Sequence, residues 1–160
     1  MLQGEGRHDA PTVYGCLYAS AEPVSAVVEQ LAGLTGTSLE PADLVRHGKP
    51  FGLGALELDD GAEFLDLDDP EVLVREDLRP SRVATNDRST TQAQAVELFE
   101  RHAEVVGLRW WSTFESLWAN VTLFDRVEPS LEVSDVQLLD VGDDVVREAA
   151  DFLGLPVNLT

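Results

Sequence analysis

The sequence has one cysteine, Cys16, one lysine, Lys49, and one methionine among its 160 residues. A single cysteine excludes a disulfide within the chain and a metal site built from several thiolates. No stretch approaches the roughly 18 consecutive apolar residues that a membrane-spanning helix needs, and the first residues lack the basic-then-apolar pattern of a signal peptide. We therefore predict a cytoplasmic protein that does not enter a membrane.

Basic residues are also scarce, because 11 Lys and Arg face 30 Asp and Glu, for a net charge of −19. Such a charge repels phosphate backbones and anionic lipids, so we predict no direct binding to nucleic acid. Two explanations stay open. The charge could serve solubility or reflect a salty or acid-biased proteome, or it could attract a basic partner protein. The 44% hydrophobic content is typical of a globular protein.

Residues 12–33 predict a strand followed by a helix. Residues 12–19 alternate in a way that favours a strand, and Ser20 is the predicted helix cap. The helix then presents apolar residues at the spacing i, i+3, i+4, i+7 and ends near Gly33; these residues are Val24, Val27, Val28 and Leu31.

The remaining elements mix strands and helices without strict alternation. We expect a helical turn at 41–46, a hairpin over 55–67 around Asp60-Gly61, a helix beginning at DDPEVL, and a helix over 92–104 capped by Thr90 or Thr91. LRWWST and ANVTLFD predict two strands, and residues 127–160 supply a last strand at QLLDV and a helix that Gly154 ends. The prediction is one α+β domain over 1–160, with a mixed, mainly antiparallel sheet and flanking helices.

Local motifs alone identify no chemistry. GLGALE at 52–57 lacks the third glycine of a dinucleotide fingerprint, and His8, His47 and His102 lack the spacing of metal ligands. We therefore expect neither a metal nor a prosthetic group.

Three segments, taken in order, resemble the RES domain, which is the toxin component of Xre/RES toxin–antitoxin pairs. They are GRHDAPTVYGCLYASAEPVSAVVEQL at 6–31, LELDDGAEFLDLDDPEVL at 56–73, and GLRWWSTFESLWANVTLF at 107–124. The resemblance covers residues 6 to about 126, and it implies a fold like that of ADP-ribosyltransferases.

The resemblance also implies a function and a set of site residues. The chain would cleave NAD⁺, its substrate, at the nicotinamide–ribose bond, and an Xre-type helix-turn-helix antitoxin would neutralise it. Glu29 and Ser112 match the family's catalytic Glu and Ser, while Arg7 and Tyr18 would bind NAD⁺. Water or phosphate as the acceptor, modification of a protein in place of NAD⁺ destruction, and a homodimer all stay open.

Each site residue also has a structural interpretation. Glu29 lies about 140° from Val24 on a helical wheel, as a solvated glutamate would. Tyr18 could be a half-buried strand tyrosine, Arg7 a frayed terminal residue, and Ser112 an ordinary strand serine. The alternative function is an inactive RES-fold protein that acts as an acidic protein-binding module. It is favoured by the acidic surface and by the lack of the aromatic-Arg segment that members usually carry upstream of Arg7.

Overall fold

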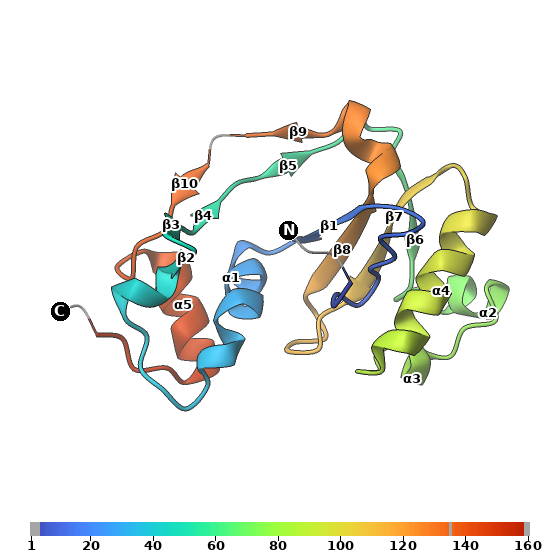
Figure 1. Cartoon of the computed structure of the whole chain (residues 1–160). Coiled ribbons are helices and arrows are strands. Elements are labelled where there is room, and N and C mark those ends of the chain that lie inside the picture. Colours follow the sequence, from blue (N-terminus) through green and yellow to red (C-terminus); the bar gives the residue numbers. More distant parts are fainter. Residues whose placement is uncertain (1–3, 135, 159–160) are drawn as a thin grey trace. The chain divides into compact units, whose positions relative to one another are not determined.

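A computed structural model describes residues 4–134 and 136–158 of the chain. The described residues form helices and a mixed sheet, which confirms the predicted α+β class (Figure 1). Internal contacts divide the chain into two compact units, each built from two segments. Unit 1 is Met1–Ala21 with Leu58–Leu131, and unit 2 is Glu22–Glu57 with Glu132–Thr160. Their union in a single RES-like domain stays a prediction.

Unit 1 is built on a four-stranded sheet in the order β1-β8-β7-β6. The strands are β1 (Cys16–Ser20), β6 (Glu63–Asp66), β7 (Val105–Trp111) and β8 (Ala119–Phe124). Strand β8 pairs antiparallel with both β1 and β7, whereas β6 pairs parallel with β7. The mainly antiparallel sheet and the strands predicted from LRWWST and ANVTLFD are thus confirmed.

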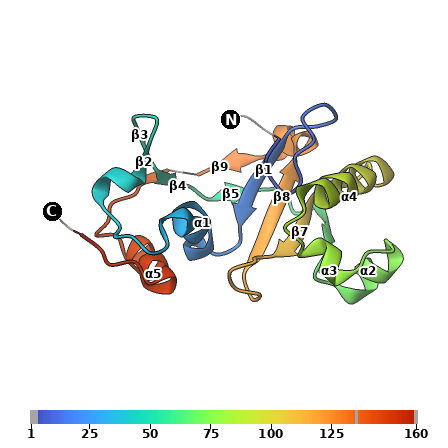
Figure 2. The same cartoon turned by 60° about the horizontal axis from the view of Figure 1, so that its bottom comes forward.

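Three helices connect β6 to its parallel neighbour β7, as a parallel pair requires a crossover. They are α2 (Pro70–Arg75), α3 (Pro80–Val83) and α4 (Arg88–Arg101) (Figures 1 and 2). Their apolar side chains join those of the sheet in one core, which includes Leu73, Val83 and Leu98 from the helices and Leu108 and Phe124 from the strands. The helices therefore cover one face of the sheet.

The register of the strands assigns each residue to one of the two sheet faces. Tyr18 pairs with Thr122, and Thr122 pairs with Leu108 of the core, so these residues share the helix-covered face. Leu17 pairs with Leu123 and therefore lies on the opposite face. After β8, the 3-10 helix η3 (Asp125–Ser130) completes unit 1.

Unit 2 contains two longer helices that lie side by side, α1 (Pro23–Leu31) and α5 (Asp144–Leu153) (Figures 1 and 2). Gly154 ends α5 with a left-handed φ of 67°, as predicted. Short elements complete the unit: the 3-10 helices η1 (Ala32–Leu34) and η2 (Pro41–Leu44), and the paired strands β2 (Val45–Arg46) with β3 (Lys49–Pro50), β4 (Gly52–Leu53) with β10 (Gln137–Leu138), and β5 (Leu56–Glu57) with β9 (Glu132–Val133).

The hairpin predicted around Asp60-Gly61 is wrong. The strand before the turn, β5, pairs with β9, and the strand after it, β6, pairs with β7. The Asp60-Gly61 turn does not make its two flanking strands pair with each other, because each of them pairs with a strand more than 40 residues away along the chain.

Helices α1 and α4 also have ends that differ from their predictions. Helix α1 is preceded by Glu22 in place of Ser20, since Pro23 occupies its first turn, and it ends at Leu31 before Gly33. Helix α4 begins at Arg88, because the Asp87 side chain accepts the free N–H groups of Ser89 and Thr90. Among the described residues, we find no helix with the length and apolarity to cross a membrane.

Candidate active site

The segment Gly6-Arg7-His8-Asp9 is largely buried within unit 1. Arg7, His8 and Asp9 are only 5%, 3% and 6% exposed. The Asp9 carboxylate accepts hydrogen bonds from the backbone N–H groups of Gly4 at 2.6 Å and Gly6 at 2.8 Å. It also accepts from the Tyr18 hydroxyl at 2.8 Å and the Cys16 thiol at 3.2 Å. One carboxylate therefore folds the N-terminal loop against β1.

Burial and hydrogen bonding act in opposite directions on this carboxylate. Burial raises the pKa of Asp9, but the bonds from Gly4, Tyr18, Gly6 and Cys16 together lower it below its ordinary value. Asp9 is thus ionised at neutral pH. Burial, followed by the bond to Asp9, raises the pKa of the Cys16 thiol to about 12.

Arg7 is held inside unit 1, contrary to its interpretation as a frayed terminal residue. Its Nη1 donates to the carbonyl oxygens of Val83 at 2.9 Å and Thr85 at 2.7 Å. The guanidinium carbon lies 4.9 Å from the centre of the Trp110 ring, at cation–π distance. The Arg7 carbonyl accepts from the Thr91 hydroxyl at 2.6 Å, which ties the loop to α4.

His8 is a neutral, structural residue at this position. Its Nδ1 lies 2.8 Å from the hydroxyl oxygen of Thr122, which also accepts from the Trp110 indole N–H at 3.2 Å. Burial, reinforced by the positive charges of Arg7 and Arg88, lowers the pKa of His8 to about 3.

Tyr18 binds the loop through its hydroxyl while its side chain stays partly accessible. The hydroxyl accepts from the His8 N–H at 2.8 Å and donates to Asp9. Burial raises the pKa of Tyr18 far above its ordinary value. The residue is nevertheless 37% exposed, so its ring is the part that a ligand could reach.

Ser112 follows β7 directly, two positions beyond Trp110, where strand alternation points to the helix-covered face. It is 2% exposed; its N–H donates to the Trp118 carbonyl at 2.8 Å and its Oγ accepts from the Phe114 N–H at 3.1 Å. Buried Asn120 of β8 pairs with Trp110 of β7, and its side-chain oxygen accepts from the Ser20 hydroxyl at 2.8 Å.

Glu29 belongs to α1 in unit 2, and its side chain is exposed as the helical wheel predicts. Val27, Val28 and Leu31 are the buried apolar residues of this helix. Ser25, one turn before Glu29 on the same helix, is fully buried.

A protein-family model described as the RES domain matches residues 2–147. The chain belongs to the RES domain family. The match confirms the resemblance read from the three sequence segments and extends it at both ends. Neither a curated protein nor a solved structure matches the chain.

Within unit 1, this RES domain brings three of the four predicted site residues to one region. Arg7 and Tyr18 are joined through His8 and Asp9, and Arg7 stacks on Trp110, two residues before Ser112. Glu29 is part of unit 2, so its action together with the other three stays a prediction. The described residues contain no group of His, Cys, Asp and Glu suited to a metal ion.

Sequence reasoning missed the residues that build this region. His8 and Asp9 were not among the predicted site residues, yet Asp9 receives four hydrogen bonds and His8 lies between Tyr18 and Thr122. The signal was a Gly-Arg-His-Asp run just before an apolar strand, because charged residues are buried only when they are paired.

Proposed function

We propose that the chain is a RES-type enzyme that cleaves NAD⁺ at the bond between nicotinamide and ribose. Membership of a family with NAD⁺-related enzymatic activity carries the proposal. The Arg7–Asp9–Tyr18 cluster supports it, because it holds a guanidinium, a carboxylate and a partly accessible aromatic ring in one region of unit 1.

The reaction needs stabilisation of a positive sugar. When the glycosidic bond breaks, its electron pair leaves with neutral nicotinamide and the ribose becomes oxocarbenium-like. A carboxylate near the ribose binds this transition state more strongly than it binds NAD⁺. Glu29 is assigned this role by its place in the family motif, and Ser112 is assigned a hydrogen bond to the substrate.

The two binding roles follow from side-chain chemistry. The Arg7 guanidinium is assigned to the NAD⁺ pyrophosphate, because its planar fork matches phosphate oxygens. Since the side chain is 5% exposed and bonded to Val83 and Thr85, this role requires the N-terminal loop to open toward the substrate. The Tyr18 ring suits stacking on nicotinamide. Attack by water would give ADP-ribose and a proton, whereas attack by phosphate would give the phosphorylated ADP-ribose.

The direct test is nicotinamide release from NAD⁺ by the purified protein, with and without phosphate. Glu29→Gln should abolish turnover while Glu148→Gln, an exposed helical glutamate of the same unit, should not. Both variants lose one negative charge, so the comparison separates a catalytic carboxylate from general charge. No release by the folded protein would contradict the proposal and favour the binding-module alternative.

The toxin role requires a separate experiment. Expression of the chain in a bacterial host should stop growth and lower cellular NAD⁺. Co-expression of a small helix-turn-helix protein encoded by an adjacent gene should restore both. Growth arrest with normal NAD⁺ would point to modification of a protein target in place of NAD⁺ destruction.

A further inference from the structure

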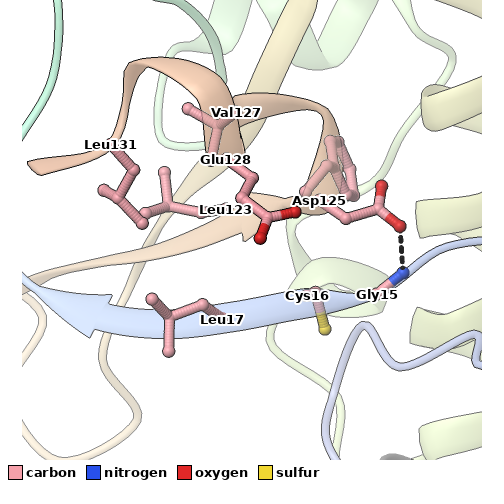
Figure 3. A pocket seen from close by; sticks show the side chains of 9 residues that line it. Gly15, Cys16, Leu17, Leu123, Asp125, Val127, Glu128 and Leu131 are labelled. Carbon is pink, nitrogen blue, oxygen red and sulfur yellow. Dashed lines mark hydrogen bonds between the residues drawn. The ribbon is translucent and has the colours of Figure 1, made fainter.

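An apolar groove lies within unit 1, on the sheet face opposite the candidate active site. Figure 3 shows Leu17 on β1 along one side and Val127 and Leu131 on the other, with Leu123 between them. Its volume is about 240 Å³, below the roughly 300–1,000 Å³ of small-molecule sites. The groove therefore suits one or two apolar side chains better than a whole cofactor.

Two hydrogen bonds join the elements on either side of the groove. The Gly15 N–H donates to the Asp125 carboxylate at 2.7 Å, and the Asp125 N–H donates to the Gly15 carbonyl at 2.8 Å. This reciprocal pair fastens η3 to the start of β1, so the groove does not depend on a mobile loop.

Acidic side chains border this apolar floor. Asp125 and Glu128 are both exposed, and the Glu128 carboxylate points toward β1 (Figure 3). Together with the net charge of −19, they favour an occupant that carries lysine or arginine beside its apolar residue.

The adjacent strand β1 is an edge of the sheet, since the strand order begins with it. Hydrogen bonds of Gly15 and Ala21 point toward the β8 side, so alternation directs the backbone groups of Tyr18 away from β8. No strand within residues 4–134 and 136–158 pairs with β1 on that outer side.

Edge strands are normally protected by lysine, proline or a bulge. The strand Cys16–Ser20 carries none of these, and its Leu17 is 41% exposed. An unprotected edge beside an apolar groove matches the requirements of strand addition, in which backbone bonds give affinity and a pocket for alternate side chains gives specificity.

We propose that the groove between β1 and η3 binds an extended, basic segment of a partner protein, which pairs with the outer edge of β1 and places an apolar side chain against Leu17. Glu128 then attracts the lysine or arginine that follows this side chain. The inference does not depend on the proposed NAD⁺ chemistry.

The test uses a fluorescent peptide of alternating lysine and leucine, with binding followed by anisotropy. Leu17→Asp should weaken binding by about tenfold or more, as loss of a central contact does. Glu128→Lys should also weaken it, whereas Glu100→Lys, the same charge change at an exposed position of α4, should have a much smaller effect. Equal effects of the two charge reversals would overturn the proposal.

Two control peptides test the mode of binding. Replacing leucine by serine keeps the charge and should reduce affinity about as much as Leu17→Asp does. N-methylation of every second residue removes the donors needed for strand pairing and should do the same. If either control binds like the parent peptide, the proposal fails.

Folding and self-association are checked on the same samples. Glu128→Lys changes an exposed side chain, so it tests the site even if Leu17→Asp fails to fold. Sedimentation that shows a wild-type dimer lost in Leu17→Asp would identify a second copy as the occupant and overturn the assignment to a basic partner.

Discussion

The carboxylate of Glu76 joins the ends of α2 and α4, and its removal should destabilise unit 1. The side chain is 2% exposed and accepts from Arg75 Nε at 2.9 Å and Arg101 Nη1 at 2.9 Å. His102 Nε2 lies 3.0 Å from the same carboxylate. Burial raises the pKa of Glu76, but these three partners outweigh it and lower the pKa from 4.5 to about 2.

The pKa difference sets an upper limit on the stabilisation. Lowering the pKa of Glu76 from 4.5 to about 2 corresponds to about 3 kcal/mol at neutral pH. The Arg75 and Arg101 side chains are 58% and 50% exposed, so solvent screens part of this energy. We therefore expect Glu76→Gln to lower the free energy of unfolding by about 2 kcal/mol, or the Tm by about 4–8 °C.

The pH dependence has a defined sign. The pKa of Glu76 is lowered on folding, so its contribution is complete well above 4.5 and is lost as pH falls toward 2. By pH 4 about a quarter of the contribution should be gone. The difference in stability between the wild type and Glu76→Gln should shrink accordingly on acidification.

The assay is denaturant unfolding followed by tryptophan fluorescence. Trp110, Trp111 and Trp118 all lie in unit 1, so the signal reports the unit that contains Glu76. Glu100→Gln, an exposed glutamate of α4, is the matched control. A Glu76 variant as stable as this control, or a difference that does not change with pH, would refute the reasoning.

Three further predictions concern glycine and cysteine. Gly6→Ala should destabilise unit 1 by about 1–3 kcal/mol in the same assay, because an added Cβ would lie 2.5 Å from the Tyr18 hydroxyl oxygen. Gly61→Ala, where nothing lies within 4 Å, is its control, and equal stability of the two variants would contradict the predicted clash. Cys16, with its pKa raised to about 12, should react with iodoacetamide about a thousandfold more slowly than an unperturbed thiol at neutral pH; rapid labelling of the folded protein would show that the thiol is not held as described. Gly154→Ala should cost about 1 kcal/mol, since its φ is 67°; an unchanged Tm would mean that this left-handed turn adapts.

The environment of Arg7 could not be predicted from the sequence. Its position near the N-terminus was compatible with a frayed residue, yet the side chain is buried and bonded to Val83, 76 positions away. Asp9 likewise receives the bonds from Cys16 and Tyr18 only once the loop folds back on β1. The Gly-Arg-His-Asp run indicates that these side chains could be buried, but it does not indicate which distant groups they contact.

The resemblance of three sequence segments pointed to the RES family. Apart from that resemblance, the sequence by itself determined the α+β class, the strands around LRWWST and ANVTLFD, and the helix that Gly154 ends. Those features depend on residues within a few positions of one another, through alternation, helical spacing and capping. Only the tertiary structure decided that β6 pairs with β7, that Asp9 and Glu76 are buried carboxylates, and that a groove lies beside β1. These features depend on contacts between distant segments, whose free energy overrides local preference once the core has formed.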